Sequence, residues 1–392
     1  MVKLPPGRDT TAMTTPAPLS VPLRWPHAKA ALVAALPGWI VARVLVGIAL
    51  GLSRFLVDHG HVDDPLARIT SSQGLLAWDG SFYADIAQHG YGSLPRAALR
   101  FFPLTPLLGR GAGWLGFGPR IGVVIVANLA ALIAGALLWT LVQREGFSSA
   151  TAKRAAWLLP LFPSAFVLVL GYAESIFLAV AIGAFVAIRD RRWLVAAALG
   201  VLAGASRPGG FILAVPIAVE GARAVRTVGV RELFARATAV LAPFVGTALF
   251  LLWVGNRFGD ALLPFRVQTR SNLKGSFTNP ASSIARAVRG LVHGHIGTGL
   301  HVPWMILAVI LIVICFRKLP ASYGWFAFVT IASAVTSNNL DSFERYALGA
   351  FPLVIVGAIL ARNLRVERAL LLLSGAAMTG YATLAFVHAY VP

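Results

Sequence analysis

The stretch from Trp78 to Pro106 contains the residues best suited to chemistry. It begins WDGSFYADIAQHGYG and ends RFFPLTP, so two carboxylates, Asp79 and Asp85, lie among aromatic and turn residues. The stretch is too polar to cross a bilayer, yet apolar segments flank it on both sides. A carboxylate at the edge of a membrane can take a proton from a lipid-borne substrate. We therefore interpret this stretch as the centre of a candidate active site.

Asp79 has two possible roles. An Asp before Gly-Ser-Phe commonly begins a helix, with its side chain as the N-cap. Alternatively, Asp79 is a general base that faces external water, with Trp78 and Tyr83 able to stack on a sugar. Asp85 lies six residues further on, which is not the same helical face. It is a cap, an ion-pair partner or a second carboxylate of the site.

The composition indicates what kind of scaffold holds these residues. The chain has 392 residues, of which 57% are hydrophobic and 12% are charged, and its mean hydropathy is +0.75. Soluble domains carry about 25% charged residues. The composition therefore predicts an all-α polytopic membrane protein built as a single domain. The single cysteine, Cys315, lies in an apolar segment and excludes a disulfide framework.

The apolar segments predict about eleven spanning helices, each of about 20 residues or somewhat fewer. They follow a Pro/Thr-rich segment, residues 1–30, which we expect to be a disordered cytoplasmic tail. Residues 101–118 are apolar but interrupted by proline and glycine, so we expect a short or re-entrant segment there. The predicted spans are 31–56, 120–142, 155–171, 173–188, 193–206, 208–222, 234–254, 302–316, 321–338, 346–361 and 369–389.

The net charge of +19 comes largely from short basic clusters between apolar segments, such as RDRR at 189–192. This distribution is typical of cytoplasmic loops that face anionic lipid, and it argues against nucleic-acid binding. With the N-terminus inside, residues 57–100 form an external catalytic loop. Residues 255–300 form a second external loop, whose basic character suggests an anionic ligand.

Three further polar interruptions fall on the same predicted external face as Asp79. They are Tyr172-Ala-Glu174, Ser206-Arg207-Pro208 and residues 341–346. Glu174 is either a solvated residue at a hairpin tip or, with Tyr172, a ligand for acceptor hydroxyls. The shared face predicts one external site.

Arg207 and Arg345 are the candidate phosphate ligands, and Tyr346 follows Arg345 directly. Guanidinium groups bind phosphate through two nitrogens and keep their charge at any working pH. Snorkelling towards lipid headgroups is the alternative for both arginines.

Metal and nucleotide chemistry have little support in the sequence. The pairs His59/His61 and His293/His295 have no third ligand at a recognisable spacing, so we expect no metal site. There is no P-loop, no G-x-G-x-x-G after a strand and no G-x-S-x-G, so we expect no nucleotide cofactor and no serine-hydrolase chemistry.

These blocks resemble the PIG-V family, which comprises the eukaryotic enzyme that adds the second mannose to glycosylphosphatidylinositol anchors, and bacterial relatives. WDGSFYADIAQHGYG followed by RFFPLTPLL is similar to the family's signature. LFPSAFVLVLGYAESIFL, AGASRPGGFIL, FGDALLPFRVQ and RYALGAFPLVI follow in the family's order, so the resemblance covers roughly residues 40–360. Ala77 and Thr105 depart from it, because eukaryotic members tend to have His and Tyr there.

The resemblance implies a fold-C (GT-C) glycosyltransferase that takes mannose from a polyprenyl-phosphate-mannose donor and transfers it with inversion. It implies that Asp79 is the general base and that Arg345 or Arg207 holds the donor phosphate, with no metal or other cofactor. The residues assigned to the sugar or the acceptor are Trp78, Tyr83, Asp85, Tyr172, Glu174 and Tyr346.

The Ala/Arg/Val-rich, Lys-poor composition suggests a high-GC bacterium. The expected acceptor is then an envelope glycolipid, glycan or glycoprotein, reached from the external face of the plasma membrane. Two alternatives stay open. One is a lipid-carrier-dependent transferase for another sugar, such as glucose or arabinose. The other is a lipid or sugar transporter or flippase, which would place ionisable groups at mid-membrane and carry paired repeats.

Overall fold

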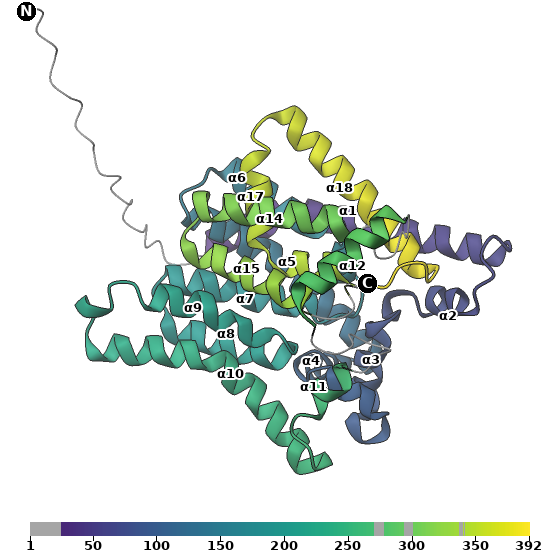
Figure 1. Ribbon diagram of the computed structural model, residues 1–392, viewed down its shortest axis with the longest axis horizontal. Coiled ribbons are helices and arrows are strands. Elements are labelled where there is room, and N and C mark those ends of the chain that lie inside the picture. Colours follow the sequence, from purple (N-terminus) through teal and green to yellow (C-terminus); the bar gives the residue numbers. More distant parts are fainter. Residues whose placement is uncertain (1–24, 270–277, 294–300, 337–339, 341) are drawn as a thin grey trace, which may run out of the picture.

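The computed structural model describes residues 25–269, 278–293, 301–336, 340 and 342–392. This part of the chain contains helices and no β-strand (Figure 1), which confirms the predicted all-α class. The α-helices are α1 (Trp25–Asp58), α2 (Pro65–Gln73), α3 (Asp79–His89), α4 (Leu104–Gly113), α5 (Gly118–Arg144), α6 (Ser149–Leu161), α7 (Glu174–Arg189), α8 (Trp193–Ser206), α9 (Ala214–Gly221), α10 (Val230–Phe258), α11 (Leu263–Gln268), α12 (Pro280–Val292), α14 (His301–Lys318), α15 (Ala321–Val335), α16 (Phe343–Gly349), α17 (Pro352–Leu360) and α18 (Leu364–Phe386).

Five described helices are long and apolar enough to cross a membrane, namely α1, α5, α10, α14 and α18. The pair α16 and α17 makes a sixth if it is one broken span, since the two helices meet at an angle of 80°. The chain is therefore a polytopic membrane protein. Each predicted span overlaps a described helix, but several of these helices are shorter than a bilayer requires. The number of about eleven crossings stays a prediction.

A proline explains the largest difference between a predicted span and the observed helix. The predicted span 155–171 is wrong in its second half: α6 ends at Leu161, two residues before Pro163, and the 3-10 helix η4 (Ala165–Leu168) follows. Proline disfavours helical geometry in the residue before it and has no N–H to donate. Pro352 likewise begins α17 after the bend.

The predicted N-terminal tail and the two predicted loops also differ from the structure. α1 begins at Trp25, so the last six residues of the predicted tail are helical, and residues 1–24 lie outside the described part. Residues 57–100, predicted to be an external loop, are largely helical: they contain α2, α3 and the 3-10 helices η1 (Gly74–Leu76), η2 (Tyr91–Ser93) and η3 (Arg96–Arg100). The second loop contains α11 and α12, whereas its basic residues Arg270 and Lys274 lie outside the described residues.

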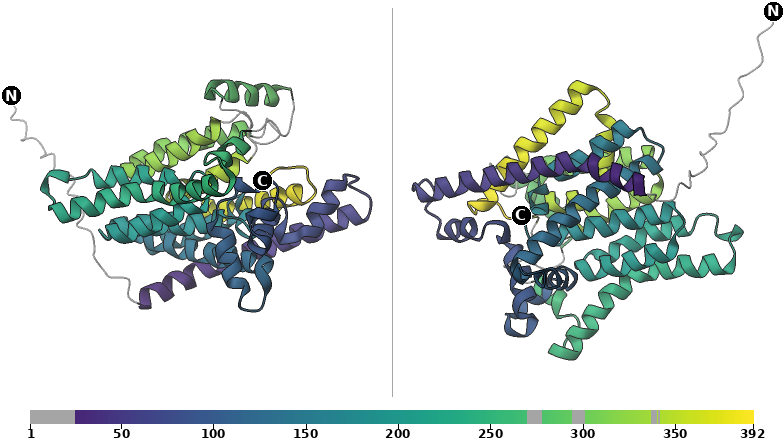
Figure 2. Two further views of the ribbon diagram at one scale, coloured as in Figure 1. Left: turned by 90° about the horizontal axis from the view of Figure 1, so that it is seen from below. Right: turned by 180° about the vertical axis from the view of Figure 1, so that it is seen from behind.

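The long helices form a continuous series of neighbours, in the order α10, α8, α7, α5, α1 and α18. Figures 1 and 2 show α8 and α10 side by side in every view. Gly204 and Gly246 explain how closely these two helices pack, because a Cβ on either would overlap a backbone carbonyl of the partner helix. Small residues are the usual means of close helix packing in membranes.

Helix α7 is the reference for locating polar groups. It begins at Glu174 and ends at Arg189, so these two residues lie about 22 Å apart along the axis at 1.5 Å per residue. Each belongs to a polar cluster, and the two clusters are therefore at opposite ends of the bundle. The C-terminal end of the chain lies near the middle of the molecule in all three views (Figures 1 and 2).

Candidate functional site

Asp79 is the first residue of α3, after the N-cap Trp78, and its side chain makes no capping hydrogen bond. The N-cap interpretation is therefore wrong. Instead, Oδ2 accepts a hydrogen bond of 2.8 Å from Nη1 of Arg345, and Oδ1 lies 3.7 Å from Nη2 of Arg100. Within the described residues, Oδ1 accepts no hydrogen bond, and 26% of the side chain is exposed. The carboxylate is thus partly exposed, and one of its oxygens accepts no hydrogen bond from a described residue.

Glu174 is buried in the bundle and pairs with both predicted arginines. Its Oε1 lies 3.5 Å from Nε of Arg345 and 3.7 Å from Nη1 of Arg207. The three side chains are at most 14% exposed. The interpretations of Glu174 as a solvated tip and of the arginines as snorkelling side chains are therefore wrong, because all three face one another inside the protein.

Arg100 is the site residue that sequence reasoning missed. It is the last residue of η3, and its guanidinium lies 4.6 Å from the centre of the Phe101 ring. Its place directly before FFPLTP, at the end of the polar stretch that contains Asp79, was the available signal. Hereafter, the "Asp79 cluster" denotes Asp79, Arg100, Glu174, Arg207 and Arg345.

The Asp79 cluster carries more positive than negative charge. It has three arginines and two carboxylates, and the Nε atoms of Arg100 and Arg345 are buried without a hydrogen-bond acceptor among the described residues. Buried charges and buried donors are costly unless they are paired. The excess charge and the unused donors together favour the binding of an anion with several oxygen atoms.

The backbone around this cluster is unusual. Non-glycine residues rarely adopt positive φ, and five described ones do so. Three of them gather here: Trp78 (φ +57°) precedes Asp79, Ser342 (φ +68°) precedes the helix of Arg345, and His388 (φ +63°) stacks on Trp78. Such strained positions persist where the surrounding contacts fix them, and they concentrate at functional sites.

Tyr172 and Tyr346 also contact the cluster. The backbone N–H of Asp79 donates to the Tyr172 hydroxyl over 3.2 Å, which satisfies one of the free N–H groups at the start of α3. Tyr172 is fully buried, and this burial raises the pKa of its phenol well above the ordinary value, so the group stays neutral. The guanidinium of Arg207 lies 5.5 Å from the centre of the Tyr346 ring.

Three residues predicted to bind the sugar or the acceptor, Trp78, Tyr83 and Asp85, have other partners in the structure. Trp78 stacks on His388 at 4.7 Å, and its Nε1 donates to the carbonyl of Ala385, so one ring face is already covered. Tyr83 is buried against Phe101 and has no open ring face for a sugar.

Asp85 pairs with Arg120 of α5. Of its three possible roles, the structure shows the ion pair. No described contact joins it to the Asp79 cluster, because six residues along α3 turn it to another side of the helix.

The described residues contain no group of three or more His, Cys, Asp and Glu side chains arranged to hold a metal. The Nδ1 atoms of His59 and His293 each contact a carbonyl four residues earlier, in the last turns of α1 and α12. His295 lies outside the described residues.

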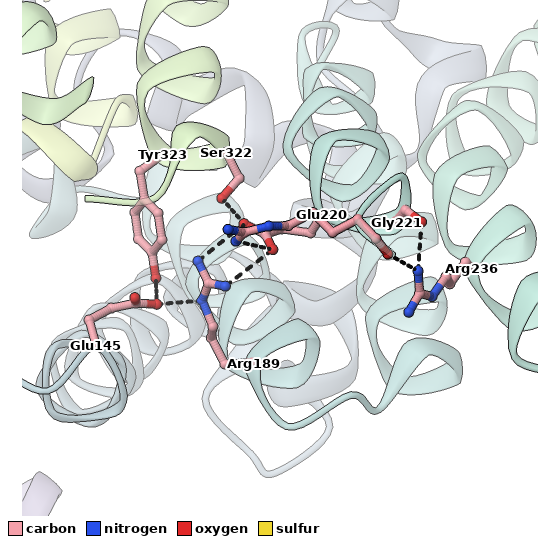
Figure 3. A network of polar contacts seen from close by, with 8 residues as sticks. Glu145, Arg189, Glu220, Gly221, Arg236, Ser322 and Tyr323 are labelled. Carbon is pink, nitrogen blue, oxygen red and sulfur yellow. Dashed lines mark hydrogen bonds and ion pairs between the residues drawn. The ribbon is translucent and has the colours of Figure 1, made fainter. Parts of the chain in front are cut away.

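A second polar cluster lies at the other end of α7 (Figure 3). There, Arg189 pairs with Glu145 and with Glu220, the latter at 3.2 Å. Tyr323 donates to Glu145 and Ser322 to Glu220, each over 2.6 Å. With Arg223, which pairs with Glu220 at 3.2 Å, these residues form the "Arg189 cluster". It joins α7, α9 and α15 to the end of α5.

No family model matches the sequence, and no curated protein matches it either. Solved structures of an oligosaccharyltransferase from Archaeoglobus fulgidus have some similarity to the chain. The apo form has a TM-score of 0.44 at 12% identity, over 89% of this chain and 56% of that one. The complex with zinc and sulfate has a TM-score of 0.42 at 14% identity, over 88% and 53%. The chain thus spans about half the length of these structures. Similarity at this level does not by itself indicate a shared activity.

Proposed function

We propose that this protein is a membrane-embedded, inverting glycosyltransferase that uses a polyprenyl-phosphate-mannose donor. Its acceptor is an envelope glycolipid, glycan or glycoprotein at the external face of the plasma membrane. The resemblance of the Trp78–Pro106 stretch to the PIG-V signature motivates the donor and the sugar. The observation that carries the proposal is the Asp79 cluster, which offers an accessible carboxylate oxygen beside three arginines.

In the proposed reaction, Oδ1 of Asp79 takes the proton of an acceptor hydroxyl. The hydroxyl oxygen forms a bond to the anomeric carbon of mannose as the bond from that carbon to the phosphate oxygen breaks. The sugar passes through an oxocarbenium-like transition state, and polyprenyl phosphate leaves with the electron pair of the broken bond. One of the two candidate arginines, Arg207 or Arg345, stabilises the negative charge that builds up on the phosphate.

Each of the other cluster residues has a place in this scheme. Arg345 contacts both carboxylates and fixes the orientation of Asp79, and Glu174 holds Arg345 and Arg207 beside each other. Arg100 lies on the other oxygen of Asp79 and still has a free Nε–H among the described contacts. The site needs no metal in this scheme, because a single phosphate carries little charge and a guanidinium group of the cluster can neutralise it.

The test is transfer of radiolabelled mannose from synthetic polyprenyl-phosphate-mannose to an envelope-lipid acceptor pool, with purified protein in detergent. Wild-type protein is expected to form a labelled product, and Asp79→Asn, which keeps the shape but removes the base, is expected to lose it. Transfer only from a glucose or arabinose carrier would support the proposed reaction but show that the donor sugar is not mannose. If folded wild-type protein transferred sugar from none of the carriers, the proposal of an enzyme would be contradicted and a transporter would be favoured.

A further inference from the structure

A small cavity adjoins the Asp79 cluster at Arg207. Its volume is about 30 Å³, which is room for two or three water-sized groups. Its walls come from α7, the turn after α8, α15 and α16, and they include Phe177, Arg207, Thr330, Tyr346 and Gly349. Four segments that are far apart in the sequence thus enclose a space beside the cluster.

Thr330 of α15 gives this cavity an unused polar group. The residue is 7% exposed, and its Oγ1 is buried with no hydrogen-bond partner in the described part of the chain. A buried hydroxyl normally has a partner, since leaving it unpaired costs stability. Thr330 lines the cavity together with Arg207. A ligand that accepts hydrogen bonds would satisfy both groups.

The size and charge of the cavity define the ligand. One guanidinium and one hydroxyl donor suit an oxyanion, and guanidinium groups bind phosphate especially well. The volume matches the free oxygens of a single phosphate. The Asp79 cluster next to it has one positive charge in excess. These features favour one phosphate group.

The position of the cavity relative to Asp79 also fits. In an inverting transfer, the base and the leaving group lie on opposite faces of the sugar. Arg345 donates directly to Asp79 at 2.8 Å, so it lies on the side of the base. Arg207 is joined to Asp79 only through Glu174 and Arg345. Arg207 is therefore the arginine placed for the departing phosphate.

We infer that this cavity is the seat of the donor's phosphate group, which Arg207 and the Thr330 hydroxyl bind by hydrogen bonds. The identity of the donor rests on the proposed function, but phosphate binding itself requires no turnover. As the sugar leaves, both donors contact the phosphate oxygen that gains charge. Arg345 then serves the base and not the phosphate.

Gly349 provides the sharpest test. A Cβ at this position would lie 3.9 Å from Nη1 of Arg207 and 4.0 Å from Cγ2 of Thr330, which is ordinary contact distance. Gly349→Ala therefore fills the cavity without a clash in the empty protein. Gly357→Ala in α17 is the matched control, because its Cβ meets only Cδ1 of Leu158, at 3.9 Å.

The measurement is titration of geranyl phosphate into purified protein in detergent micelles, with geraniol as the neutral probe. We expect Gly349→Ala to unfold at the wild-type temperature or higher and to bind geranyl phosphate at least about tenfold more weakly, because the methyl group takes the space of the ligand. Gly357→Ala is expected to bind as wild type does.

Thr330→Val is the second variant, since valine keeps the shape and removes the unpaired hydroxyl. We expect binding about tenfold weaker, the loss of one hydrogen bond to a charged group, with no fall in the unfolding temperature of the ligand-free protein. A purely structural hydroxyl would instead lower that temperature. Thr379→Val in α18, where Oγ1 donates to the carbonyl of Gly375, is the control for which binding should not change.

Several outcomes would overturn the inference. If Gly349→Ala and Thr330→Val both bound geranyl phosphate as tightly as wild type and Arg345→Lys did not bind it, the phosphate site would lie outside the cavity. The proposed function would not be affected. Equal binding of geraniol would exclude a phosphate seat. Inorganic phosphate that binds as tightly as geranyl phosphate would identify a site for the free ion. Cavity-dependent binding without sugar transfer from any carrier would instead contradict the proposed function alone.

Discussion

The two polar clusters at the ends of α7 differ in how completely their donors and charges are used. In the Arg189 cluster, two carboxylates face two arginines, and no buried polar side-chain atom lacks a partner among the described residues (Figure 3). In the Asp79 cluster, three arginines face two carboxylates. The Nε atoms of Arg100 and Arg345 donate no hydrogen bond to a described residue, and Nε of Arg345 has only the longer ion-pair contact of 3.5 Å with Glu174. Both clusters are largely buried in the same bundle.

The comparison shows that buried charge alone does not identify a binding site. A cluster that satisfies all its own groups holds helices together and leaves nothing for a ligand to contact. A cluster with surplus charge and unused donors has lower stability than a complete one, and a ligand can supply what is missing. By this criterion, the Asp79 cluster is the functional one. Four substitutions test the distinction.

The largest effect is expected from Arg189→Met, which removes the cation shared by Glu145 and Glu220. Two buried carboxylates would then lack their main partner, so we expect a loss of about 3–5 kcal/mol in stability. The measurement is the midpoint of thermal unfolding in detergent. Arg191→Met is the control: its side chain is 62% exposed, and its loss should cost at most about 1 kcal/mol. Equal midpoints for the two variants would contradict a structural role for the Arg189 cluster.

Asp79→Asn is expected to have the next largest effect, on turnover and not on folding. Mannose transfer should fall about 100-fold or more because the general base is lost. Asp85→Asn changes the other carboxylate of the same helix, which pairs with Arg120 away from the cluster, and should retain nearly all activity. If both variants lost activity equally, α3 as a whole and not Asp79 would be required.

Tyr323→Phe and Tyr172→Phe remove one phenol hydroxyl from each cluster. Tyr323 donates to the Glu145 carboxylate over 2.6 Å, so its loss should cost about 1.5–3 kcal/mol of stability. The transfer rate of the folded protein should not change. A slower rate at unchanged unfolding temperature would show that the Arg189 cluster contributes to the reaction.

Tyr172→Phe should have the smallest effect on stability, about 0.5–1.5 kcal/mol, because it removes a neutral acceptor from the N–H of Asp79. Turnover should fall by less than about tenfold, since that N–H helps to position the base. Rates and unfolding midpoints measured together separate the two tyrosines. If Tyr323→Phe slowed transfer and Tyr172→Phe lowered only stability, the Arg189 cluster would be the functional one and the Asp79 cluster the structural one.

Local patterns predicted the helices well where strong signals bound an apolar segment. The predicted span 193–206 coincides with α8, which begins after RDRR and ends before Arg207-Pro208. The prediction failed after Leu161, because hydropathy continues past Pro163 but the hydrogen-bonded helix does not. The polar residues Glu174, Arg207 and Arg345 could be picked out from the sequence because each interrupts an apolar segment.

The sequence by itself therefore determined an all-helical membrane protein and the positions at which polar residues interrupt its helices. Only the tertiary structure decided which of those residues meet. Arg345 contacts Asp79 across 266 positions, Arg100 joins them from the other side, and Thr330 lines the cavity although it sits in an ordinary apolar helix. Hydropathy and helix propensity act over one or two turns, whereas these contacts depend on how distant helices pack. A single sequence records the first kind of information directly and the second only through the fold.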